Sequence, residues 1–191
     1  MKKHLLTFIL LSLISLSANS QVHDGHEYVD LGLSVKWATM NIGASKPEEY
    51  GDYFAWGETA PKLGYSWNTY KWGCITYDNK MTKYHNSDYA KITLHVSDDA
   101  AHANWGGSWR MPTHEEIDEL CKNCTSTLTT KNGVYGRKFV GPNGNSIFLP
   151  AAGFLFFSSL FNACSIGGYY WSSSLNDGFP YEALGLYFNK S

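Results

Sequence analysis

Apolar and polar residues alternate regularly in residues 28–39 (YVDLGLSVKWAT). The apolar positions that share one face are Val29, Leu31, Leu33, Val35 and Trp37. A period of two residues is typical of a β-strand with one buried face. The pattern therefore predicts one strand from Tyr28 to Ala38.

A different period begins at Thr113. Glu116 follows Thr113 by three residues, which is the arrangement of a capping box, and the next apolar positions recur at helical spacing. These positions are Ile117, Leu120, Cys121 and Cys124. We predict a helix here, and a shorter helix that is capped by residues 97–99 and extends through Asn104.

Short strands separated by turn signals are expected in the second half of the chain. We predict strands at residues 136–140 and 147–149, next to the turn sequences KNGV and GPNGN. Residues 169–174 and 183–188 are expected to pair antiparallel, residues 154–161 to form an apolar loop, and residues 60–95 a long irregular stretch. The predicted class is α+β, with two helices packed on a small, mostly antiparallel sheet with long irregular loops.

The first twenty residues have the layout of a secretory signal peptide. Lys2 and Lys3 precede an apolar run from Leu5 to Leu16, and small residues lie at Ala18 and Ser20. We expect cleavage between Ser20 and Gln21 and a protein that is secreted, periplasmic or on the cell surface. The run is too short for a membrane span, although a retained anchor is the alternative. Residues 21–27 are then a flexible lead-in, and residues 28–191 a single domain.

Charge and composition narrow the range of partners. The chain has 15 basic and 17 acidic residues, and removal of Lys2 and Lys3 leaves 13 against 17, a net charge of about −4. There is no run of Lys and Arg, which excludes the electrostatic footprint of a nucleic-acid-binding protein. Aromatic residues make up 16% of the chain, and they serve either as core or as a contact surface.

The cysteines leave several alternatives open. Export favours disulfides among Cys74, Cys121, Cys124 and Cys164, for which three pairings exist. The spacing of Cys121 and Cys124 also occurs in half a zinc site or a redox pair, but a buried thiol or a structural disulfide is the simpler interpretation. His23 and His26 form either a loose metal site or part of a solvated tail.

Five motifs, in this order, resemble the bacterial Fibrobacter succinogenes major paralogous domain family: YVDLGLSVKWAT at residue 28, GDYFAWGE at 51, WGGSWRMPT at 105, FLPAAG at 148 and GYYWSSS at 168. That family is similar to C-type-lectin-like folds and to formylglycine-generating enzymes, whose Arg-Leu-Pro-Thr signature is similar to residues 110–113 here. The resemblance implies an exported, surface-associated protein. It also implies a further closing strand beyond residue 191, so that the opening strand and the domain lack their last partner.

The resemblance implies a ligand surface near the final strands. The candidate ligand-binding residues there are Trp171, Ser173, Asn176, Asp177 and Tyr181. Rings that stack on a sugar or peptide, with amide and carboxylate hydrogen bonds, are typical of such a surface. Alternation along residues 169–174 nevertheless favours Trp171 as a core residue.

Catalysis is not expected. The related oxidases use a pair of late cysteines, whereas Cys164 has no neighbouring cysteine here. Calcium is a weaker alternative, with Asp98 and Asp99 or Asn176 and Asp177 as ligands, and no other metal or cofactor is predicted. We expect an exported, non-catalytic module that binds a glycan or a surface protein. The alternatives are an assembly subunit whose first strand pairs with a partner chain, and a formylglycine-generating-type oxidase.

Overall fold

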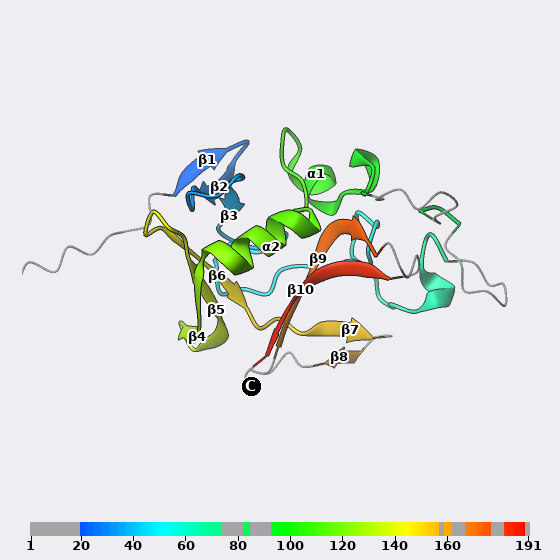
Figure 1. The fold of residues 1–191 in the computed structure, drawn as a ribbon. Coiled ribbons are helices and arrows are strands. Elements are labelled where there is room, and N and C mark those ends of the chain that lie inside the picture. Colours follow the sequence, from blue (N-terminus) through cyan, green and yellow to red (C-terminus); the bar gives the residue numbers. More distant parts are fainter. Residues whose placement is uncertain are drawn as a thin grey trace, which may run out of the picture.

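The computed structural model describes residues 20–73, 82–84, 93–156, 159–161, 167–176 and 182–189. These residues form a small α+β domain with two α-helices and mostly antiparallel sheets (Figure 1). The helices are α1 (Ala100–Trp105) and α2 (His114–Asn123), with short 3₁₀ helices at Trp67–Thr69 and Val96–Asp98. The strands are β1 (Gln21–His23), β2 (His26–Val29), β3 (Trp37–Ala38), β4 (Thr125–Lys131), β5 (Val134–Val140), β6 (Ser146–Pro150), β7 (Phe154–Phe156), β8 (Ser159–Phe161), β9 (Gly167–Leu175) and β10 (Ala183–Asn189).

Strand pairing produces four small sheets. Their strand orders are β1-β2-β3, β4-β5-β6, β7-β8 and β10-β9, and every pair of strands is antiparallel. Single bridges from Thr93 to Ser174 and from Gly153 to Gly168 join β9 to neighbouring segments. The strands β5 and β6 and the β9–β10 pair confirm the prediction from the turn signals, whereas β4 was not predicted.

The predicted single strand from Tyr28 to Ala38 is wrong. The chain turns back after Val29, and β2 pairs with β3 through Tyr28 with Ala38 and Val29 with Trp37. Gly32 has φ +76° within this turn, a conformation that favours glycine. Since β2 also pairs with β1, it lies in the centre of its sheet and is not the unpaired opening strand that was expected.

Residues 21–27 are not a flexible lead-in. They form the β1–β2 hairpin, whose two turn residues, Asp24 and Gly25, have φ 48° and 81°. An Asp-Gly pair with two positive φ angles is typical of a tight hairpin turn. The Tyr28 hydroxyl donates a hydrogen bond to Gln21 across the hairpin, and the His26 ring stacks on Trp105 at 4.5 Å between centroids.

Both predicted helices are confirmed together with their caps. The Thr113 hydroxyl accepts a hydrogen bond from the Glu116 N–H at 3.3 Å, and the Glu116 carboxylate accepts one from the Thr113 N–H at 2.8 Å. Asp99 caps α1 by accepting from the His102 N–H at 3.0 Å. These local contacts satisfy N–H groups that the first turn of a helix leaves without partners.

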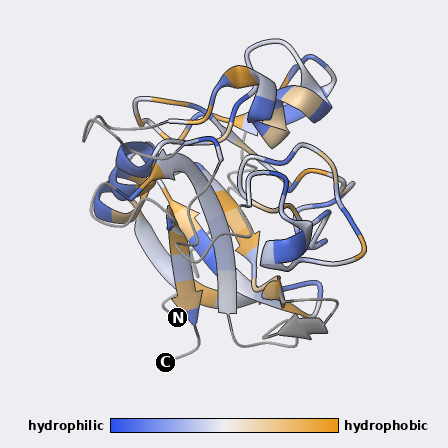
Figure 2. Ribbon diagram, turned by 90° about the vertical axis from the view of Figure 1, so that its right-hand side faces the viewer, coloured by the Kyte–Doolittle hydropathy of each residue, from blue (hydrophilic) through white to orange (hydrophobic). Residues whose placement is uncertain are grey.

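Helix α2 packs against the strands over the main core. Its buried residues Ile117 and Leu120 belong to a cluster contributed by β2, β5, β6 and β10, in which Phe139 and Phe188 are the largest side chains. The most strongly hydrophobic stretches lie on strands inside the domain (Figure 2). A second cluster forms around Trp56, Leu94 and Leu175. The two clusters fix the position of β9 and β10, which carry the candidate site.

Two further segments complete the comparison with the predictions. Residues 154–161 were expected as an apolar loop, but Phe154–Phe156 and Ser159–Phe161 are strands and form the β7–β8 pair. The described part of residues 60–95 has one short 3₁₀ helix and is otherwise irregular, as predicted. None of the helices in the described ranges has the length and apolar character needed to cross a membrane.

Candidate functional site

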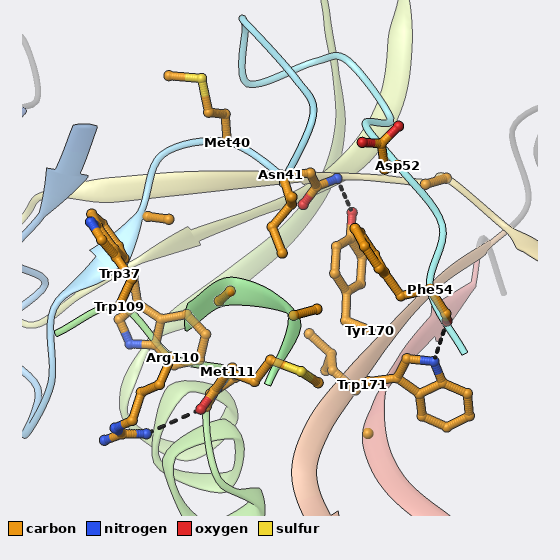
Figure 3. Close-up of a pocket in the computed structure, with 18 of the residues that line it drawn as sticks. Trp37, Met40, Asn41, Asp52, Phe54, Trp109, Arg110, Met111, Tyr170 and Trp171 are labelled. Carbon is orange, nitrogen blue, oxygen red and sulfur yellow. Dashed lines mark hydrogen bonds between the residues drawn. The ribbon is translucent and has the colours of Figure 1, made fainter. Parts of the chain in front are cut away.

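A cleft of about 1090 Å³ lies where the N-terminal sheet, the segments around both helices and the β9–β10 pair meet (Figure 3). Its lining comes from segments far apart in the sequence, around residues 34–42, 50–54, 100–112, 152–155, 169–171 and 185–187. Aromatic side chains dominate the lining, among them Trp37, Trp109, Tyr170, Trp171 and Tyr187. A large cavity with apolar walls and a few polar groups is typical of a ligand site.

Two tyrosines hold one wall of the cleft in place. The Tyr170 hydroxyl donates to the Pro150 carbonyl at 2.6 Å and lies 3.5 Å from the Asn41 amide nitrogen (Figure 3). The Tyr53 hydroxyl donates to the Ala152 carbonyl at 2.6 Å. Burial raises the pKa of Tyr170, and burial together with the neighbouring Tyr50 raises the pKa of Tyr53 to about 12. Both phenols are therefore neutral donors: Tyr170 fixes β9 to the end of β6, and Tyr53 fixes its loop to the segment after β6.

An aromatic shelf, defined here as Phe154, Tyr169, Trp171 and Tyr187, borders the cleft on the outer face of β9 and β10. Tyr169, Trp171 and Tyr187 are 38%, 45% and 54% exposed. The ring centroids of Phe154 and Tyr169 are 4.8 Å apart, and those of Tyr169 and Tyr187 are 4.6 Å apart. The Trp171 indole N–H donates to the Phe54 carbonyl at 3.1 Å, which fixes the ring with part of its surface in solvent (Figure 3).

The prediction that Trp171 is a core residue is wrong. The buried face of β9 carries Tyr170 and the fully buried Ser172, so Tyr169 and Trp171 lie on the outer face. The polar side chain of Ser172 can be buried because its hydroxyl donates a hydrogen bond to the Leu184 carbonyl at 2.8 Å. Trp171 thus remains a candidate contact residue, because it lies on the exposed face of β9, whereas the alternation of residues had placed it on the buried face.

Of the other predicted site residues the structure describes Ser173 and Asn176, and neither belongs to the aromatic shelf. Ser173 is 3% exposed, and its backbone N–H and hydroxyl both donate to the Pro112 carbonyl, at 2.7 and 3.2 Å, so it is a structural residue. Asn176 is half-buried at the end of β9 and donates its backbone N–H to Glu182 at 2.8 Å. Asp177 and Tyr181 lie outside the described residues.

Sequence reasoning missed Phe154, Tyr169 and Tyr187 as site residues. The signal was present in the two-residue spacing of Tyr169 and Trp171, which places both rings on one face of a strand. The register pairs Tyr187 with Tyr169 across the two strands. Neither motif alone indicates this pairing, because it depends on how the two strands align in the folded protein.

The charged pair beside the cleft supports the start of α2. Arg110 donates two hydrogen bonds to the Glu116 carboxylate, at 2.8 and 2.5 Å. These bonds raise the pKa of Arg110. Burial would raise the pKa of Glu116, but the bonds from Arg110 and from the Thr113 N–H together lower it. The two charges compensate each other and complete the capping box.

His23, Asp24 and Ser108 at the rim have the composition of a hydrolase triad but a different geometry. His23 Nε2 lies 2.9 Å from the Ser108 hydroxyl and 3.1 Å from an Asp24 oxygen. In a triad the base contacts the nucleophile and the acid through its two different nitrogens. Here one nitrogen contacts both groups, so Asp24 does not orient the imidazole through the nitrogen opposite Ser108 as the acid of a triad does.

The aspartates considered for calcium are held by protein donors. Asp98 is 3% exposed and contacts the ammonium groups of Lys71 and Lys83 and the hydroxyl of Tyr84. The ammonium groups of Lys71 and Lys83 therefore already balance the charge of this carboxylate, as a metal ion would. The Asp99 carboxylate accepts hydrogen bonds from the backbone N–H groups of His102 and Met111, at 3.0 and 2.8 Å. Within the described ranges, no three His, Cys, Asp or Glu side chains gather as a metal site.

Cys121 and Cys124 carry free thiols, and Cys74 and Cys164 lie outside the described residues. Burial is the main cause that raises the pKa of both described thiols, with the Asp118 charge adding to it at Cys121. A raised pKa lowers the fraction of thiolate, which is the reactive form. Neither residue lines the large cleft.

Comparison of the chain with protein-family models, curated proteins and solved structures finds no match. The case for a function therefore depends on the geometry of the cleft and the aromatic shelf.

Proposed function

We propose that this chain is an exported, non-catalytic, lectin-like module that binds a glycan on the aromatic shelf. The observation that carries the proposal is the exposure of Tyr169, Trp171 and Tyr187 on one face of the β9–β10 pair. Exposed rings side by side offer flat apolar surfaces with polar edges, which suit the C–H faces of a sugar ring.

The spacing of the rings favours a chain of sugars over a single one. Tyr169 and Trp171 are two residues apart on an extended strand, roughly 7 Å, and Tyr187 lies across from Tyr169. The rings are also held in place, because the Trp171 indole and the contact between Tyr169 and Tyr187 restrict their rotation. A surface ordered before binding loses less conformational entropy when the ligand arrives.

Export and the lectin-like character have separate support. The first twenty residues have the charge and apolar pattern of a signal peptide. The five motifs that resemble the major paralogous domain family include GYYWSSS, which supplies β9 and two shelf residues. The two helices and the late antiparallel pair are compatible with a lectin-like arrangement.

The test uses the mature chain in affinity gel electrophoresis against soluble polysaccharides of different linkage, followed by titration calorimetry. We expect retardation by at least one polysaccharide and a loss of affinity of at least about tenfold in Trp171→Ala and in Tyr187→Ala. Tyr135→Ala is the matched control, because Tyr135 on β5 is 37% exposed and lies outside the shelf. Absence of retardation throughout the series, or equal retardation of all variants, would contradict the proposal.

The assembly alternative required a free opening strand. Of the residues predicted for that strand, β2 pairs with β1 on one side and β3 on the other, so only β3, two residues long, lies at an edge of the sheet. Concentration-dependent oligomers in size-exclusion chromatography would favour the assembly alternative.

A further inference from the structure

The first residues of the exported chain carry four nitrogens that one metal ion can bind together. The expected cleavage between Ser20 and Gln21 leaves Gln21 with a free α-amine and makes His23 the third residue. The α-amine, the backbone amides of Val22 and His23, and the His23 imidazole then follow one another along a short stretch of chain. We propose that residues 21–23 of the mature protein bind one copper(II) ion through these four nitrogens. The proposal shares the expectation of export with the proposed function, but it does not depend on glycan binding.

The His23 ring is oriented for such a site. Its Nε2 lies 2.9 Å from the Ser108 hydroxyl and 3.1 Å from an Asp24 carboxylate oxygen. Its Nδ1, the ring nitrogen nearer to the backbone, has no hydrogen-bond partner in the part of the chain that the structure describes. A proton on Nε2 that is donated to Asp24 leaves the lone pair of Nδ1 for a metal ion. Metal-binding histidines generally donate their other ring N–H to a carboxylate in this way, which fixes the ring.

The other nitrogens are accessible to a metal ion. Gln21, Val22 and His23 are all exposed, and Val22 is 67% exposed. They form β1, an outer strand of its sheet (Figure 1). Bonded and non-bonded pairs alternate along an antiparallel ladder, and the pair next to the turn, His23 with His26, is a bonded one. The neighbouring Val22 amide therefore points away from β2.

The side chain of Gln21 is held away from its own amine. An N-terminal glutamine loses its amine as a ligand when the amine nitrogen attacks the side-chain amide carbon, ammonia leaves and a ring closes. In the structure the Tyr28 hydroxyl donates a hydrogen bond to the Gln21 side-chain oxygen across the hairpin. This bond keeps the side chain extended toward Tyr28 and opposes the ring closure.

Metal binding and strand pairing compete at this end of β1. Copper(II) replaces the protons of the Val22 and His23 amides and the proton of the charged amine, and its oxidation state does not change. The His23 amide then no longer bonds to His26, so residues 21 and 22 leave β2 and fold around the metal. His23 itself stays attached to the segment after α1, because its carbonyl accepts a hydrogen bond from the Trp109 indole N–H at 3.1 Å. We expect a local rearrangement confined to the start of the mature chain.

The donor set selects the metal. Nitrogen ligands in one plane suit copper(II) and, next to it, nickel(II), whereas zinc(II) prefers a tetrahedral arrangement. The main chain supplies three of the four ligands, so the site needs no second metal-binding side chain. This distinguishes it from a site that uses His23 and His26 together, since the His26 ring is stacked on Trp105 at 4.5 Å between centroids.

The test starts with the exported protein. The full-length chain is expressed, the exported fraction is purified, and N-terminal sequencing with mass spectrometry establishes whether it begins at an unmodified Gln21. Copper(II) is then added in the presence of excess glycine, which removes weakly bound metal. We expect one copper per chain, with the visible absorption and the electron paramagnetic resonance of nitrogen ligands in one plane. Tryptophan fluorescence should be quenched, since the ring centroids of His23 and Trp109 are 6.2 Å apart.

Matched variants separate this site from weaker ones. His23→Gln should lose at least about a hundredfold in affinity, and so should a chain that begins at Ser20, in which the histidine is no longer the third residue. Asp24→Asn should lose about tenfold, because asparagine tolerates the positive φ of the turn but is a weaker acceptor for Nε2. His26→Gln is the control and should bind copper as the wild type does.

The results that overturn the site differ from those that overturn export. An exported chain that begins at Gln21 but lacks the spectrum of planar nitrogen ligands would overturn the site and leave export and glycan binding standing. Ring closure of Gln21 in the exported protein, a start at another residue, or an equal loss of affinity in His26→Gln would do the same. A chain that keeps Met1 and stays in the cell would overturn export together with the site.

Discussion

Asp98→Asn tests how much the buried carboxylate of Asp98 contributes to the stability of the fold. Asp98 ends the 3₁₀ helix before α1, is 3% exposed, and accepts hydrogen bonds from Lys71, Lys83 and the Tyr84 hydroxyl. Asparagine keeps the shape of the side chain but removes its charge. The variant therefore leaves two ammonium groups beside a neutral amide and weakens the attachment of Lys71, Lys83 and Tyr84 to the helical segment.

The expected loss follows from the unequal exposure of the partners. Breaking a fully buried ion pair costs about 3–5 kcal/mol, but exposed pairs are worth at most about 1 kcal/mol. Asp98 is buried, whereas the side chains of Lys71 and Lys83 are 49% and 39% exposed, so screening reduces the effect. We expect the free energy of unfolding to fall by about 2 kcal/mol at neutral pH, and the midpoint of thermal unfolding by about 4–8 °C.

The pH dependence has a definite sign. Burial alone would raise the pKa of Asp98, but hydrogen bonds from Lys83 and Tyr84 and the charges of Lys83 and Lys71 together lower it. A carboxyl whose folded-state pKa is lowered stabilises the protein above its unfolded pKa of about 3.9. This contribution is lost as the pH falls through the folded-state pKa. The difference between the wild type and Asp98→Asn should therefore close in strongly acidic solution.

Circular dichroism melts from about pH 2 to pH 8 measure this difference. Asp118→Asn is the control, because Asp118 pairs with Lys122 on the exposed face of α2 and its loss should not change the melting midpoint measurably. A difference between the wild type and Asp98→Asn that stays constant across the pH range would refute the electrostatic reasoning. An equal effect of Asp118→Asn would refute the role assigned to burial.

Two further predictions concern the cleft wall and the thiols. Tyr170→Phe should lower the free energy of unfolding by about 1 kcal/mol, because the buried Pro150 carbonyl loses one of its donors and keeps the Ala152 N–H at 2.8 Å. Denaturant titration measures this, and unchanged stability would show that the Ala152 N–H alone satisfies the carbonyl. Iodoacetamide labelling with peptide mapping should modify Cys121 slowly in the folded protein, because burial raises the pKa of its thiol. Cys124 should react only on unfolding, because its thiol pKa is also raised and the residue is 8% exposed. Equal labelling rates of the two cysteines in the folded protein would contradict this prediction.

Local signals in the sequence predicted the elements whose contacts are local. The capping box of α2 joins residues three apart, and the turns at KNGV and GPNGN lie between strands that follow each other directly. The prediction of a single strand from Tyr28 to Ala38 was wrong, because alternating apolar and polar residues also fit a chain that turns back on itself. Val29 and Leu31 are both fully buried although a turn follows them. The pattern identified the buried side chains but not the path of the backbone.

The candidate site was predictable only in part. The motif GYYWSSS located β9 and identified Trp171, but the assignment of its faces was reversed. Small polar residues are normally placed outside, yet the hydroxyl of Ser172 and both donors of Ser173 bond to backbone carbonyls in the interior. These acceptors come from residues 184 and 112, which no local pattern connects with β9. The outer position of the rings follows from these distant contacts.

The two halves of β9 differ in burial, and this difference explains how the strand supports the aromatic shelf. In the second half Ser172, Ser173 and Ser174 are all buried, and contacts to Trp56, Pro112 and Thr93 hold the strand from several directions. The first half presents its rings to solvent on one face. A strand fixed at one end supplies a rigid support at the other, so we expect that the aromatic shelf needs little reordering when a ligand binds. Loosening the buried serines should therefore weaken binding without touching any contact residue.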